Sequence, residues 1–100
     1  MPNAVMFISF RLVPGASVPD FLLATEKLNS EHMSKQKGYV SWKQLREGET
    51  WVDFIEWETM EDAGRAMEAG CETETAAAFF AFLDQESVET HLYSVEKSYT

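Results

Sequence analysis

Residues 5–13 read Val-Met-Phe-Ile-Ser-Phe-Arg-Leu-Val and run directly into Pro14-Gly15. This stretch predicts a β-strand, because alternate residues of a strand point to opposite faces and both faces here are largely apolar. One face carries Met6, Ile8, Phe10 and Leu12, and the other carries Val5, Phe7 and Val13. Pro14 lacks a backbone donor and Gly15 allows a turn, so the strand is expected to end there.

The rest of the chain alternates helical and extended patterns. Ser17 is a good N-cap for a helix that reaches about Gln36, with the apolar stripe Val18, Phe21, Leu22, Thr25 and Leu28. Residues 39–46 and 51–57 predict a hairpin around Gly48. Thr59 begins a second helical region that Gly70 interrupts, a further helical stretch covers residues 73–84, and residues 90–97 form the last strand.

The predicted order is therefore β-α-β-β-α-β. Because parallel crossovers are right-handed, this order favours a four-stranded antiparallel sheet with strand order 4-1-3-2 and both helical regions on one face. The fold class is α+β and ferredoxin-like, and residues 1–100 are expected to form a single domain.

Helices can cover only one face of such a sheet, yet several strands are apolar on both faces. A solvated antiparallel face would show polar residues at alternate positions. Leaving large apolar side chains in water would forgo roughly 1.5–3 kcal/mol for each of them. We therefore expect a homodimer packed through the open sheet face.

Charge and motif content exclude several classes of function. Eight Lys and Arg residues against 17 Asp and Glu give a net charge of −9, which argues against binding to nucleic acid or to an anionic membrane surface. Cys71 is the only cysteine, and no basic N-terminal segment precedes an apolar run, so we expect a cytoplasmic protein. No motif for a phosphate loop, a dinucleotide or a zinc site is present, and no cofactor or metal is predicted.

Two segments resemble the antibiotic-biosynthesis-monooxygenase-like family. They are residues 10–15, Phe-Arg-Leu-Val-Pro-Gly, which lead into the Ser17 helix, and residues 55–63, Ile-Glu-Trp-Glu-Thr-Met-Glu-Asp-Ala. The resemblance implies a dimeric α+β barrel of the ferredoxin-like superfold. The family includes cofactor-independent monooxygenases that act on phenolic polyketides and quinols, and its members commonly bind the ligand between sheet and helices. The resemblance therefore also implies a ligand cavity at that place.

The chain departs from the family pattern at several positions. Many members have an acidic residue two positions before the tryptophan, where this chain has Ile55, and a histidine about ten residues after it, where this chain has residues 66–68, Ala-Met-Glu. The haem-degrading branch uses a histidine on the second helix and an asparagine on the first strand. Residues 59–86 contain no histidine and residues 5–13 contain no asparagine, so haem degradation is disfavoured.

The tryptophans are candidate ligand contacts. Trp42, Trp51 and Trp57 all fall on predicted strands, where they serve either the core and dimer interface or the wall of an aromatic pocket. Trp42 is the first choice for a wall that stacks on a phenolic or quinone ring, because its strand is an edge in the expected order. Trp57 is a further candidate ligand contact.

Charged residues interrupt the apolar strands at Arg11, Asp53 and Glu56. By alternation, Asp53 shares a face with Trp51 and Trp57, and Glu56 lies on the opposite face. One alternative is that Asp53 or Glu56 forms an ion pair with Arg11 at the dimer rim. The other is that one of these carboxylates lies partly buried in a pocket, has a raised pKa and takes a proton from a phenol.

Two histidines complete the set of candidates. His91 lies on the last predicted strand, on the same face as Tyr93, and is the predicted acid–base residue because histidine titrates near neutral pH. Its alternative role is a packed or interfacial side chain, and Tyr93 beside it is a candidate ligand contact. His32 is expected to be a helix-terminal histidine favoured by the helix dipole.

Two functions follow from these patterns. One is a cofactor-independent monooxygenase-like enzyme that acts on a small aromatic compound, and the other is a non-catalytic ligand-binding or structural homodimer. The observation that would help most to choose between them is whether a cavity of about 300 Å³ or more is present between sheet and helices. The enzyme hypothesis weakens if Phe79, Phe80 and Phe82 fill that space.

Overall fold

The structure, a computed structural model, describes residues 3–69 and 72–100. Its elements are β1 (Ala4–Phe10), α1 (Val18–Glu31), the 3-10 turn η1 (Met33–Lys35), β2 (Tyr39–Glu47), β3 (Thr50–Trp57), α2 (Met60–Ala69), α3 (Glu74–Phe80), the 3-10 turn η2 (Gln85–Ser87) and β4 (Glu89–Ser94). The four strands form one antiparallel sheet in the order β2-β3-β1-β4. The predicted α+β ferredoxin-like fold and strand order are confirmed.

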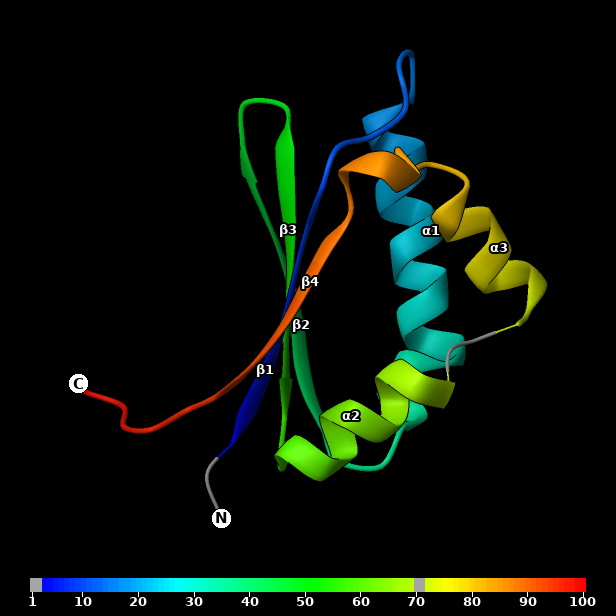
Figure 1. The fold of residues 1–100 in the computed structure, drawn as a ribbon. Helices are drawn as coiled ribbons and strands as arrows, with labels where there is room; N and C mark the ends of the chain where they lie inside the picture. The colour runs from blue at the N-terminus through cyan, green and yellow to red at the C-terminus, as the bar shows by residue number, and fades with distance from the viewer. Residues whose placement is uncertain (1–2, 70–71) are drawn as a thin grey trace.

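All helices cover the same face of the sheet, and the opposite face is uncovered (Figure 1). Along β3, burial alternates strictly, with Trp51, Asp53, Ile55 and Trp57 buried on the helix side. Residues with the opposite parity, such as Phe54 on β3 and its partner Phe7 on β1, point to the uncovered face. The face that the sequence assigned to Asp53 is therefore confirmed.

The helix α1 begins as predicted and ends earlier. Ser17 Oγ accepts a hydrogen bond from the backbone N–H of Asp20 at 3.3 Å, and Phe21, Thr25 and Leu28 are buried. Leu22, which the sequence placed on the same stripe, is 44% exposed. His32 leaves the helical conformation, so η1 replaces the last predicted turn before Gly38 turns the chain with φ +83°.

The strand β1 is shorter than predicted, because residues 11–13 leave the sheet and pair with the segment that follows α3. The Val13 N–H donates to the Phe82 carbonyl and the Asp84 N–H donates to the Arg11 carbonyl, both at 2.8 Å. The Arg11 side chain accordingly lies 4.0 Å from the Asp84 carboxylate. The expected pairing of Arg11 with Asp53 or Glu56 was wrong, because Arg11 has already left the sheet.

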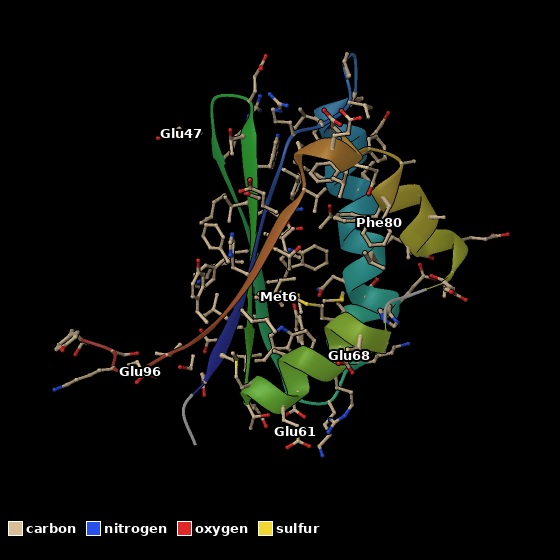
Figure 2. All side chains as sticks on the ribbon, viewed as in Figure 1. Met6, Glu47, Glu61, Glu68, Phe80 and Glu96 are labelled. Carbon is tan, nitrogen blue, oxygen red and sulfur yellow. The ribbon has the colours of Figure 1, made fainter. Side chains whose placement is uncertain are left out.

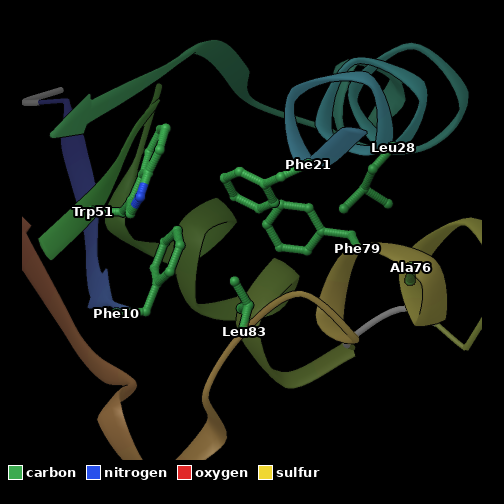
Figure 3. Close-up of a cluster of buried hydrophobic side chains, with 7 residues drawn as sticks. All are labelled: Phe10, Phe21, Leu28, Trp51, Ala76, Phe79 and Leu83. Atoms are coloured by element: carbon green, nitrogen blue, oxygen red, sulfur yellow. The ribbon is translucent and has the colours of Figure 1, made fainter. Parts of the chain in front are cut away.

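The second helical region consists of two separate helices, α2 and α3, and each covers its own part of the core. The predicted interruption at Gly70, and Cys71, lie outside the described residues. One cluster of buried residues lies beneath α1 and α3, as Figure 3 shows, and consists of Phe10, Phe21, Leu28, Trp51, Ala76, Phe79 and Leu83. The other lies beneath α2 and consists of Ala4, Met6, Ile55, Trp57 and Ala63.

The last strand, β4, is shorter than the predicted 90–97 and ends at Ser94. The chain beyond it extends away from the sheet to the C-terminus (Figure 1). Every helix in the described residues is too short or too polar to cross a lipid bilayer.

Candidate functional site

A cavity of about 220 Å³ lies between the sheet and the helices. Its sheet wall contains Met6, Ile8, Trp42, Asp53, Ile55 and Thr90. Its helical wall contains Leu28, His32, Met33, Gln36, Ala66, Met67, Ala76, Phe79 and Phe80. Apolar walls with a few polar groups are typical of small-molecule sites.

The cavity occupies the boundary between the two buried clusters. Ile8, Met33 and Trp42 pack against both clusters, and all three line the cavity. Figure 2 shows Met6 on the helix-facing side of the sheet and Phe80 on α3. Met67 on α2 and Phe80 on α3 line the cavity while remaining 40% and 46% exposed, so the cavity wall is in contact with solvent at these two residues.

Asp53 is the buried carboxyl of this site. Its residue is only 3% exposed, and its Oδ1 accepts a hydrogen bond from Gln44 Nε2 at 3.1 Å across the β2–β3 pair. Burial raises the pKa of Asp53 to about 6, against the smaller lowering effects of Gln44 and of the Trp42 indole. Asp53 is therefore mostly ionised at neutral pH and accepts a proton readily.

A short chain of hydrogen bonds holds this carboxyl in place. The Gln44 amide nitrogen also donates to Thr25 Oγ1 at 3.2 Å, and the Thr25 hydroxyl donates to the Phe21 carbonyl at 2.9 Å within α1. Sequence reasoning missed Gln44 and Thr25. Gln44 could have been found from the hairpin, because it lies two residues from Trp42 and pairs directly with Asp53.

Trp42 lies on the edge strand β2 and lines the cavity, as the sequence predicted for a wall residue. Its ring meets Phe79 edge-on, with ring centroids 5.7 Å apart. Its indole Nε1 is buried and has no hydrogen-bond partner among the described residues. The indole N–H therefore acts on the Asp53 carboxyl without reaching the geometry of a hydrogen bond.

His32 brings a second titratable group to the cavity. It caps the C-terminus of α1, as expected for a helix-terminal histidine, and its side chain also lines the cavity. The Gln36 side-chain amide lies 3.4 Å from its ring nitrogens. No sequence signal distinguished this cavity position from an ordinary helix terminus.

The other predicted ligand contacts do not line this cavity. Trp57 is fully buried beside Tyr39, with ring centroids 6.0 Å apart, and belongs to the core. Glu56 lies on the uncovered face of the sheet, where it accepts a hydrogen bond from Asn3 Nδ2 at 2.6 Å.

His91 and Tyr93 also lie on the uncovered face. Their rings stack with centroids 5.8 Å apart and planes 17° apart, and Phe7 meets Tyr93 edge-on. Both residues are exposed, and the sheet separates them from Asp53 and Trp42. The structure thus divides the predicted catalytic and ligand-binding residues between the two faces of the sheet, and of these Trp42 and Asp53 line the cavity.

Aromatic residues of α3 and of the segment that follows it fill part of the space above the sheet. Phe79 and Phe82 pack against Phe21 at 5.5 and 5.7 Å between centroids. The remaining 220 Å³ is below the roughly 300–1,000 Å³ of common ligand pockets, so the cavity suits a ligand with a single ring. Within residues 3–69 and 72–100, no group of three or more His, Cys, Asp or Glu side chains is arranged to hold a metal ion.

Solved structures of similar shape cover nearly the whole chain. A mutant of SnoaB, a cofactor-independent oxygenase from Streptomyces nogalater, matches with a TM-score of 0.75 and 17% identity over 98% of this chain and 97% of that one. A proposed antibiotic biosynthesis monooxygenase from Bordetella bronchiseptica matches with a TM-score of 0.71 and 14% identity, covering 93% of this chain and 96% of that one. This is the fold of the antibiotic biosynthesis monooxygenases.

A second protein described in the same way, from Bacillus cereus, has the antibiotic biosynthesis monooxygenase fold and matches with a TM-score of 0.66. It is 18% identical and covers all of this chain and 97% of its own. No protein-family model and none of the curated proteins matches the sequence. At these identities the similarity establishes the monooxygenase fold, and the chemistry must be argued from the cavity.

Proposed function

We propose that the protein is a cofactor-independent monooxygenase-like enzyme that acts on a small phenolic or quinol substrate in the cavity between sheet and helices. The observation that carries this proposal is the buried carboxyl of Asp53, with a pKa of about 6, in the wall of an apolar cavity. A general base is most effective when its pKa lies near the working pH. The fold shared with SnoaB supports an oxygenase among the reactions that such a base can serve.

The proposed chemistry needs only the substrate, dioxygen and a base. The Asp53 carboxylate takes the hydroxyl proton of the phenol, and the resulting phenolate, whose para ring carbon has carbanion character, adds dioxygen at that carbon. The hydroxyl proton, the hydrogen of that carbon and the outer oxygen atom then leave as water, so a phenol and O₂ give a quinone and H₂O. Trp42 forms the aromatic wall that orients the ring, as both residues line the same cavity.

We also propose that the uncovered sheet face is a homodimer interface. That face carries Phe7, Leu45, Val52, Phe54 and Tyr93, of which Leu45 and Tyr93 are 47% and 52% exposed. A contiguous apolar patch of this kind marks an interaction site. In this assembly, which we place in the cytoplasm because the chain has a single cysteine, His91 and Tyr93 contact the partner subunit.

The oxygenase proposal is tested by oxygen consumption with a panel of single-ring phenols and hydroquinones. The wild-type protein is expected to consume oxygen, and Asp53→Asn is expected to lose a factor of about 10²–10⁴, the usual contribution of a general base. His91→Ala provides the comparison, because His91 lies on the other sheet face. Loss of activity in His91→Ala but not in Asp53→Asn would assign the base to His91.

A non-catalytic ligand-binding homodimer is the second candidate. The cavity volume of about 220 Å³, which is small for an enzyme that accepts fused rings, favours it. A thermal shift with aromatic ligands and no oxygen consumption with any of them would support this function. If aromatic ligands produce neither a thermal shift nor oxygen consumption, a structural homodimer is the one proposed function that remains.

A further inference from the structure

The indole N–H of Trp42 is buried and has no hydrogen-bond partner among the described residues. A buried polar group without a hydrogen bond costs about 1–3 kcal/mol, and most such groups in folded proteins are satisfied by protein, water or ligand. Trp42 Nε1 has no partner in the described residues, and its ring forms part of the cavity wall. The neighbouring Asp53 carboxyl does not reach hydrogen-bond geometry with this N–H, so a group inside the cavity can supply its acceptor.

The Asp53 carboxyl lies beside this N–H. Trp42 pairs with Ile55 across the β2–β3 ladder, so Asp53 is its diagonal neighbour on the same face. One oxygen of Asp53 accepts from Gln44, and the residue lines the cavity together with Trp42. The site thus presents a donor and an acceptor next to each other in an otherwise apolar wall.

We propose that Trp42 and Asp53 together recognise a free hydroxyl group on a single aromatic ring. A hydroxyl oxygen accepts the N–H of Trp42 while its own hydrogen is donated to the Asp53 carboxylate, so one group satisfies both side chains. A methyl ether accepts but cannot donate, and an unsubstituted ring does neither. This inference rests on the proposed function, and it makes Trp42 a specificity-determining residue of that site.

Trp57 also has a buried indole N–H without a hydrogen-bond partner among the residues that the structure describes. Because Trp57 does not line the cavity, a ligand in the cavity cannot accept from it. The cavity volume of about 220 Å³ further limits the ligand to one ring with small substituents. If Asp53 takes the hydroxyl proton, the Trp42 N–H donates to the phenolate that results.

The first test uses the wild-type protein and two ligands that differ only at the hydroxyl, 4-nitrophenol and 4-nitroanisole. Isothermal titration calorimetry at pH 6.5, above the pKa of Asp53 and below the pKa of the 4-nitrophenol hydroxyl, is expected to show 4-nitrophenol binding at least about tenfold more tightly. That ratio corresponds to about 1.4 kcal/mol, the order of one hydrogen bond to a charged group. Equal affinities would overturn the proposal without the need for any variant.

The second test compares Trp42→Phe with Trp51→Phe. Trp51 lies on the same sheet face but outside the cavity, with the Arg46 guanidinium 5.0 Å above its ring, and is the matched control. Trp42→Phe keeps an aromatic wall and removes the N–H, so 4-nitrophenol is expected to bind about tenfold more weakly while 4-nitroanisole is unchanged. Circular dichroism checks that both variants are folded.

The outcomes separate this inference from the oxygenase proposal. Hydroxyl-dependent binding that Trp42→Phe abolishes, without oxygen consumption by any quinol, supports the recognition site and contradicts the enzyme. Oxygen consumption whose KM is the same in Trp42→Phe and wild type contradicts the recognition site and leaves the enzyme standing. If Trp42→Phe weakens the binding of 4-nitrophenol and 4-nitroanisole equally, Trp42 serves only as an aromatic wall of the cavity. That result also overturns the inference.

Discussion

Gln44 donates a hydrogen bond from Nε2 to Oδ1 of Asp53 at 3.1 Å, directly across the β2–β3 pair. The contact joins an edge strand to a central one and fixes the only buried carboxyl that lines the cavity in the described residues. Two opposing effects set the pKa of Asp53. Burial disfavours the charged form, and the Gln44 amide favours it.

Asp53→Asn is expected to stabilise the protein above pH 6. The folded state holds the Asp53 proton up to about pH 6, whereas the unfolded chain releases it near 3.8, so the free energy of unfolding falls as pH rises between these values. The asparagine keeps an acceptor for Gln44 and carries no charge. Urea unfolding should show a gain of about 1–3 kcal/mol at pH 7.5 that shrinks towards zero below pH 4. A gain that is independent of pH would contradict the raised pKa.

Gln44→Met is expected to move the pH profile of kcat/KM upwards. Wild-type activity should rise with pH through about 6, because Asp53 must be ionised to act as a base. Removing the amide that lowers this pKa should shift the midpoint upwards by about one pH unit. Thr25→Val is the control, because it leaves the bond between Gln44 and Asp53 in place. An unchanged midpoint in Gln44→Met would show that the amide has no electrostatic effect.

Phe54→Glu is expected to separate the proposed dimer. Phe54 lies on the uncovered face opposite Phe7, and a two-fold interface would bury two copies of the new charge. Size-exclusion chromatography with light scattering should report a monomer for this variant and a dimer for wild type. Leu23→Glu places the same charge on α1 at a residue that is 63% exposed, and should remain dimeric. A wild-type monomer at micromolar concentration would contradict the interface.

Ala66→Leu is expected to abolish ligand binding while preserving the fold. Ala66 lines the cavity from α2, and leucine is nearly as good a helix former as alanine, so the main effect is loss of cavity volume. The affinity for 4-nitrophenol should fall at least about tenfold. Ala69→Leu changes an exposed position of the same helix and should bind normally. Normal binding by Ala66→Leu would show that ligands bind elsewhere.

The sequence predicted the arrangement of the fold better than its cavity. Strict alternation on β3 placed Asp53 with Trp51 and Trp57, and the order of strands and helices, with the right-handed crossover rule, predicted the strand order. Alternation on β4 correctly grouped His91 with Tyr93, but it could not show whether this set of alternate residues or the other set faces the helices. That choice depends on pairing with β1, where His91 lies opposite Phe7 on the uncovered side.

The residues that sequence reasoning missed act through long-range contacts. His32 has the composition of an ordinary helix terminus, and only the packing of α1 on the sheet brings it to the cavity. Arg11 was expected to pair with Asp53 or Glu56, but the pairing of residues 11–13 with residues 82–84 brings it to Asp84. Such pairings depend on chain segments about 70 residues apart and leave no periodic signal in the sequence.

The division of the cavity between a wall of strands and a wall of helices has a consequence for how this protein can change its ligand. Asp53, Trp42 and Gln44 stand on strands, whereas small and flexible residues such as Ala66, Met67 and Ala76 stand on the helices that form the opposite wall. Substitutions on the helices can therefore reshape the cavity without disturbing the hydrogen bonds of the carboxyl. A family built on this plan can acquire new ligands by altering one wall while the reactive group stays where it is.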